Sequence, residues 1–327
     1  MDLKNLAGAL RLDVAVGRGR DFFLENRVGR WRWPFALLGA LVFIVLMIVL
    51  TAPLGFLMEE GDPDEFLAMR PGSLYGFISF ATVGLSFLIP AALTLRLVHG
   101  QNPFAALGPG GRFGWGDFAR GVGAAASLGA AGLVIAMIFS PEALKLAPKS
   151  PDYVLWFALA AAILLVQSFG EEYFFKGYLA RVWGAIVPYR FIIVPALSAI
   201  FASVHAGNPD VAADLYFSLL VTFMMAAFTY VIYLRTESLG AVTGLHWFNN
   251  LWAICIVATA PVQSEAMALA VYVDPVLSSG GSRLADPRAY LELALMFAVL
   301  WLLLASRRSP FYLAPRAATP PAGAALA

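Results

Sequence analysis

The sequence has few charged residues and almost no cysteine. Only 13% of its 327 residues are Asp, Glu, Lys or Arg, whereas 60% are hydrophobic. A water-soluble domain of this length needs more charge to solvate its surface, so the composition excludes an ordinary soluble globular protein. The single cysteine, Cys255, excludes an internal disulfide and a cysteine-rich metal site. With a net charge of +1, the chain has no strongly basic surface, and we expect no nucleic-acid partner.

The hydrophobic residues form long continuous runs rather than alternating patterns. Inside lipid every backbone polar group must be hydrogen-bonded within the protein, so such runs cross a membrane as helices. A span needs about 20 apolar residues. We therefore predict an all-α fold, a polytopic transmembrane bundle of about eight helices. The predicted spans are residues 35–58, 74–98, 118–139, 153–183, 191–205, 212–234, 239–260 and 290–304.

Lys and Arg gather in alternate connections between these spans. Such residues accumulate on the cytoplasmic side of membrane proteins, which predicts that both termini lie in the cytoplasm, in this case on the inner side of a bacterial inner membrane. Lys145 and Lys149 are exceptions, because they fall on the predicted outer side. The expected divisions are a basic cytoplasmic segment (1–32), a transmembrane domain (33–306, with its core at about 150–260) and a disordered cytoplasmic tail (307–327).

Three clusters of polar residues interrupt the apolar spans. Ionisable groups inside a membrane are costly, so each cluster is a candidate site. The clusters are Glu171, Glu172 and Lys176 in the fourth span, His205 at the end of the fifth, and His246 with Asn250 in the seventh. From the helical rise, Glu171, His205 and His246 lie roughly 18, 25 and 12 Å from the cytoplasmic ends of their helices. These depths are compatible with one cavity.

Helical spacing separates the two glutamates. Residues four apart share a face, so Glu172 can pair with Lys176, whereas Glu171 points about 100° away. His246 and Asn250 also share a face. Each cluster alone has a structural explanation, such as an ion pair or an interhelical hydrogen bond, but those explanations do not account for the similar depths.

A carboxylate beside two imidazoles suits two related kinds of hydrolysis. Glu171 can act as general base on a water while a histidine or amide stabilises the oxyanion. Alternatively, Glu171, His205 and His246 can bind a divalent metal such as Zn²⁺, which activates the water. The residues themselves leave the metal and metal-free mechanisms open.

The ordered motifs Glu171-Glu172-x-x-x-Lys176, Phe201-x-x-x-His205 and His246-x-x-x-Asn250 resemble a known family. It is the CAAX protease and bacteriocin-processing (CPBP, Abi) family of intramembrane endopeptidases, which includes the type II CAAX prenyl endopeptidases. The resemblance implies that Glu171 activates water with His205, and that His246 and Asn250 stabilise the oxyanion. Glu172 would be an auxiliary residue. The family's arginine is Lys176 here, which keeps the charge but loses the bidentate geometry.

The resulting hypothesis is an intramembrane endopeptidase that acts on a membrane-tethered or lipidated, CAAX-like peptide among membrane lipids. Two alternatives stay open. One is a non-catalytic scaffold or bacteriocin-immunity-type protein on the same fold, and the other is an ion-coupled transporter.

Overall fold

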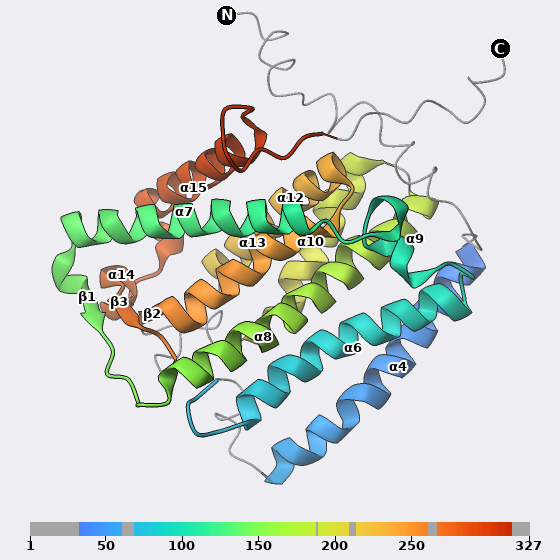
Figure 1. Ribbon diagram of the computed structural model, residues 1–327, viewed down its shortest axis with the longest axis horizontal. Coiled ribbons are helices and arrows are strands. Elements are labelled where there is room, and N and C mark those ends of the chain that lie inside the picture. The colour runs from blue at the N-terminus through green and yellow to red at the C-terminus, as the bar shows by residue number, and fades with distance from the viewer. Residues whose placement is uncertain (1–32, 61–68, 188, 209–213, 261–266, 316–327) are drawn as a thin grey trace, which may run out of the picture.

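A computed structural model describes residues 33–60, 69–187, 189–208, 214–260 and 267–315. The predicted basic segment 1–32 and the last part of the predicted tail, 316–327, lie outside the described residues. The described chain is a bundle of helices that run roughly side by side, with a small sheet at one end (Figure 1).

The main helices of the bundle follow the hydrophobic runs of the sequence. They are α4 (Trp33–Glu60), α6 (Tyr75–Leu97), α7 (Trp115–Phe139), α8 (Tyr153–Glu172), α9 (Ala180–Ile186), α10 (Arg190–Val204), α12 (Leu215–Thr236), α13 (Leu239–Leu251) and α15 (Pro287–Ala305). Two π-helices continue α8 and α13, namely η4 (Tyr173–Leu179) and η5 (Trp252–Ile256). The short helices are η1 (Pro103–Ala106), η2 (Pro109–Gly111), η3 (Pro141–Ala143), α14 (Pro275–Ser278) and η6 (Arg283–Ala285).

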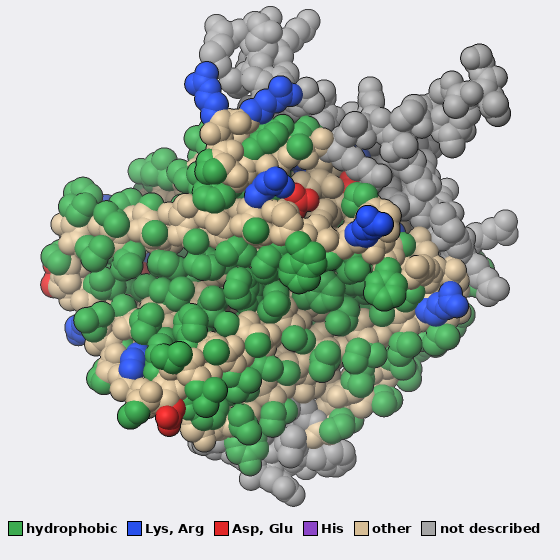
Figure 2. All heavy atoms as spheres, in the orientation of Figure 1, with side chains coloured by type: hydrophobic (Ala, Val, Ile, Leu, Met, Phe, Trp, Pro, Cys, Tyr) green, Lys and Arg blue, Asp and Glu red, His purple; other side chains and the backbone are tan. Residues whose placement is uncertain are grey.

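Six of the described helices are long and apolar enough to cross a membrane. They are Trp33–Pro53, Tyr75–Leu97, Trp115–Phe139, Tyr153–Gly184, Leu215–Thr236 and Pro287–Ala305. The predicted polytopic helical bundle is therefore confirmed. The fifth predicted span is an apolar helix of only 15 residues, α10. Hydrophobic side chains cover most of the face shown in Figure 2, with the charged side chains mainly toward its edges, as expected of a surface in contact with lipid.

The prediction of the seventh span, 239–260, is wrong at its C-terminal end. The helical part stops at Ile256, and Val257–Ala260 forms strand β2. This strand pairs in parallel with β3 (Ala270–Val273), which also pairs antiparallel with β1 (Leu144–Leu146). A short apolar run has no periodicity that separates helix from strand, so the sequence pattern hid the change. Lys145, an exception to the charge pattern, belongs to this sheet.

The predicted disordered tail is also wrong for residues 307–315. Leu313 is fully buried, and its backbone N–H donates to the Leu304 carbonyl at 2.8 Å. The Arg235 side chain on α12 donates to the Leu313 carbonyl at 3.0 Å. The segment 307–315 is thus fixed to the bundle because it carries an apolar anchor among its polar residues.

Glycines set the close approach of the helices that carry the candidate site. A Cβ placed on Gly170 of α8 would lie 2.0 Å from the Gly84 carbonyl oxygen of α6. A Cβ on Gly244 of α13 would lie 2.3 Å from the Phe118 carbonyl oxygen of α7. Small residues allow membrane helices to pack backbone against backbone. These contacts fix how far α8 and α13 sit from their neighbours, and therefore where their polar side chains meet.

Candidate active site

The two adjacent glutamates end α8 and are both buried, with 4% exposure for Glu171 and 1% for Glu172. The next helical turns form the π-helix η4, which carries the fully buried Lys176. Its Nζ lies 2.6 Å from Glu172 Oε2, so the predicted ion pair is present. The Lys176 ammonium also lies 4.8 Å from the centre of the Tyr230 ring. One turn of π-helix inside a longer helix is often associated with a functional site.

The histidines come from two other helices and meet at Glu171. His205 caps the C-terminus of α10, and its Nε2 lies 3.9 Å from Glu171 Oε2. His246 lies on α13, and its Nε2 is 3.6 Å from the same oxygen. The predicted meeting of these three residues is therefore observed, although they are far apart in the sequence.

The other ring nitrogen of each histidine is already hydrogen-bonded. His205 Nδ1 lies 2.7 Å from the Phe201 carbonyl oxygen, and His246 Nδ1 lies 2.9 Å from Glu172 Oε1. Carbonyl and carboxylate oxygens only accept hydrogen bonds, so we assign the proton to Nδ1 in both rings. In its neutral form each ring then turns an Nε2 lone pair toward Glu171, whereas a protonated ring would place an Nε2–H there.

This assignment leaves three acceptor atoms close together, namely Glu171 Oε2 and the two Nε2 atoms. Glu171 Oε2 is buried and has no hydrogen-bond donor among the described residues. Its distances to the two Nε2 atoms are too long for direct hydrogen bonds. A water about 2.8 Å from Glu171 Oε2 and from one of the imidazoles fits the separation, and it would supply the missing protons.

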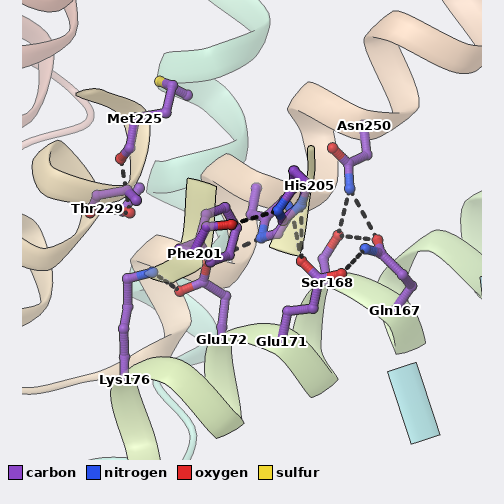
Figure 3. Close-up of polar contacts among 12 residues, drawn as sticks. Gln167, Ser168, Glu171, Glu172, Lys176, Phe201, His205, Met225, Thr229 and Asn250 are labelled. Carbon is purple, nitrogen blue, oxygen red and sulfur yellow. Dashed lines mark hydrogen bonds and ion pairs between the residues drawn. The ribbon is translucent and has the colours of Figure 1, made fainter. Parts of the chain in front are cut away.

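Asn250 binds α8 side chains rather than pointing away from them (Figure 3). Its Nδ2 donates to Gln167 Oε1 at 2.9 Å and to Ser168 Oγ at 3.3 Å. Gln167 Nε2 in turn donates to Glu171 Oε1 at 2.5 Å. Sequence reasoning missed Gln167. The signal was available, because Gln167 is a polar residue one helical turn before Glu171 in an apolar span.

Aromatic contacts hold the site-bearing helices together. The Trp247 indole N–H donates to the Ala161 carbonyl of α8 at 2.8 Å, and its ring stacks on Phe118 of α7. On the other side, the Phe201 ring packs against His205 with ring centres 4.5 Å apart. The rotation of α13 and the ring of His205 are both fixed in this way.

A metal centre is the alternative use of these donors. Across the described parts of the chain, no group of three or more His, Cys, Asp or Glu side chains has an arrangement that would hold a metal ion. Glu171, His205 and His246 as placed do not form such a group.

Comparison with known protein families identifies a family that the site-bearing segment resembles. Residues 153–252 match the family model described as type II CAAX prenyl endopeptidase Rce1-like. This segment, which carries the candidate site, is similar to that family. The matched segment contains all six candidate residues, and the resemblance predicted from the three motifs is confirmed.

A more distant similarity covers more of the chain. The uncharacterized protein YyaK of Bacillus subtilis (strain 168) is 24% identical over 251 residues, which are 72% of this chain and 80% of YyaK. No solved structure matches the chain. At the level of the family, the Rce1-like core indicates a protease of the CAAX type in an integral membrane protein.

Proposed function

We propose that the protein is an intramembrane endopeptidase in which Glu171 activates a water molecule to hydrolyse a peptide bond. The observation that carries this proposal is the convergence of Glu171 Oε2 with the Nε2 atoms of His205 and His246 inside a bundle of apolar helices. The Rce1-like core supports it, because the family is one of membrane endopeptidases. The proposed substrate is a membrane-tethered or lipidated peptide, since the helices that hold the site are surrounded by lipid.

In the first step, a water beside the two atoms forms hydrogen bonds to Glu171 Oε2 and to His205 Nε2, which are 3.9 Å apart. The carboxylate accepts a proton from the water while the water oxygen attacks the carbonyl carbon of the scissile peptide bond. The hydrogen bond from His205 Nδ1 to the Phe201 carbonyl keeps the Nε2 lone pair directed at the water.

In the second step, the developing oxyanion needs a hydrogen-bond donor. His246 can supply it in its protonated form, because the Nδ1–H is held by Glu172 and the Nε2–H is directed toward Glu171 Oε2. Glu172 lies between Lys176 and that imidazolium, so one positive charge of the three groups is left to be balanced by the oxyanion. Glu171 then delivers its proton to the leaving nitrogen, the C–N bond breaks, and the products are a carboxylic acid and an amine, between which the acid proton is transferred on release.

Lys176 does not reach the reacting atoms in this scheme. It is fully buried, and its ammonium lies against Glu172 and the Tyr230 ring. A lysine in place of the family's arginine therefore keeps the internal ion pair, which is the part of the motif that the mechanism requires.

The test is cleavage of a quenched fluorescent peptide that carries a prenyl group and a CAAX-like end, with purified protein in proteoliposomes. Glu171→Gln keeps the size of the side chain but removes the base, so we expect the rate to fall by about 10²–10⁴-fold. Glu142→Gln makes the same chemical change at an exposed position outside the site and should leave the rate unchanged. Wild-type rates in Glu171→Gln would refute the proposal.

A non-catalytic scaffold is the second candidate, and Lys176 is the observation that favours it, because a changed motif residue is common where activity has been lost. In that case, partner binding or protection would survive Glu171→Gln. The same variant therefore separates the two functions.

A further inference from the structure

We propose that Gln167 positions the Glu171 carboxylate and that Asn250 acts on catalysis by holding Gln167 in place. This inference rests on the proposed function. It assigns a role to a residue outside the three motifs and a different role to one inside them.

Gln167 lies one turn before Glu171 on the same face of α8, and both side chains are buried. The Gln167 amide N–H donates to Glu171 Oε1. A hydrogen bond to an ionised acceptor is stronger than one between neutral groups. With Oε1 held, the carboxylate has one orientation, in which Oε2 faces the two imidazoles.

The Gln167 side chain is itself held in one orientation. Its Oε1 accepts from Asn250 Nδ2 at 2.9 Å and from Ser168 Oγ at 3.3 Å. If the Gln167 amide were reversed, its NH₂ would face the Asn250 NH₂ and its oxygen would face the Glu171 carboxylate. Both contacts would be repulsive, so the network has a single consistent arrangement.

The same network uses the whole donor capacity of Asn250. An amide NH₂ has two hydrogens, and the two acceptors of Asn250 Nδ2 are Gln167 Oε1 and Ser168 Oγ. Asn250 and His246 share α13, so the network also fixes the distance between the helix that carries the base and the helix that carries His246.

The experiment is a double-mutant cycle on prenyl-peptide cleavage with Gln167→Met, Asn250→Leu and both together. Each single change should lower kcat by roughly tenfold, with KM within about twofold, because it misorients the base without removing a substrate contact. The double variant should be no slower than the slower single variant. Thr222→Val, which removes only a bond to the backbone of its own helix, is the control and should behave as the wild type.

Multiplied effects, about a hundredfold in the double variant, would overturn the inference, because they would mean that Asn250 acts independently of Gln167. Ser168→Ala is a milder variant in case Gln167→Met does not fold. We expect it to lower kcat a few-fold at unchanged KM, since it removes one anchor of Asn250 and one donor to Gln167. An unchanged kcat in folded Ser168→Ala would contradict the relay.

Glu171→Gln, measured in the same experiment, distinguishes a failure of the Gln167–Asn250 inference from a failure of the proposed function. If it abolishes cleavage while the effects of Gln167→Met and Asn250→Leu multiply, only the relay is wrong. If it cleaves as fast as the wild type, the proposed function itself is wrong, and the relay with it.

Discussion

His246 lies between two carboxylates that are adjacent in the sequence: its Nδ1 is 2.9 Å from Glu172 Oε1, and its Nε2 is 3.6 Å from Glu171 Oε2. Adjacent residues point about 100° apart on a helix, so the two glutamates approach the ring from different sides. The Glu172 carboxylate pairs with Lys176, whereas Glu171 Oε2 is buried without a hydrogen-bond donor among the described residues. Glu171 and Glu172 thus have different chemical surroundings because they point in different directions from α8.

The buried ion pair should be sensitive to the loss of one partner. Lys176→Met leaves Glu172 charged and unpaired except for His246, and should reduce the free energy of unfolding by about 3–5 kcal/mol. Adding Glu172→Gln to Lys176→Met should recover part of this loss, because no buried charge is then left alone. Thermal unfolding in detergent measures both effects. A double variant that is less stable than Lys176→Met would contradict the charge-pairing explanation.

The glycine contacts predict that a change from glycine to alanine destabilises the protein at one position and has little effect at another. Gly170→Ala places a Cβ 2.0 Å from the Gly84 carbonyl oxygen and must separate α6 from α8, so we expect a loss of about 1–3 kcal/mol and reduced cleavage. Gly132→Ala is the matched control, because a Cβ there meets no atom within 4 Å. Equal unfolding temperatures for the two variants would show that the close approach is unimportant.

The segment 307–315 should contribute to stability through Leu313. Leu313→Ala removes a fully buried side chain and should lower the free energy of unfolding by about 2–5 kcal/mol. Leu146→Ala makes the same change at a side chain that is 87% exposed and should have little effect. Chemical denaturation of the two variants compares them directly, and a small effect at Leu313 would mean that the segment is only loosely attached.

The proposed orientation can be measured because the chain has a single, buried cysteine, Cys255. In intact bacteria, Lys145→Cys should react with a membrane-impermeant maleimide, since the sheet lies on the proposed outer side. Arg308→Cys should react only after the membrane is permeabilised. The unmodified chain controls for background labelling. The reverse pattern would invert the proposed topology and place both termini outside.

Sequence spacing was sufficient to predict the bundle, the Glu172–Lys176 pair and the meeting of Glu171 with two histidines. These features depend on helical periodicity and on depth along a helix. The hydrogen bond from Asn250 to Gln167 could not be predicted, because it depends on how α13 is rotated against α8. That rotation is set by glycine contacts and by Trp247, which no pattern within one helix reveals.

The two corrections to the fold have a similar cause. Residues 257–260 are apolar whether they form the end of a helix or a strand, and only pairing with β3 decides between them. The sequence prediction placed residues 307–315 in a disordered tail, and only the burial of Leu313 shows that they are packed. In both segments the deciding contacts are made with distant parts of the chain.

The most direct test of water activation by Glu171 measures prenyl-peptide cleavage and metal content on the same purified samples, before and after treatment with a chelator. If Glu171 is the base, the metal-depleted wild type cleaves at its original rate and Glu171→Gln does not cleave. Loss of cleavage on chelation that is restored by Zn²⁺, together with stoichiometric zinc that is lost in Glu171→Gln and His246→Ala, would contradict this mechanism and make the site a metal centre.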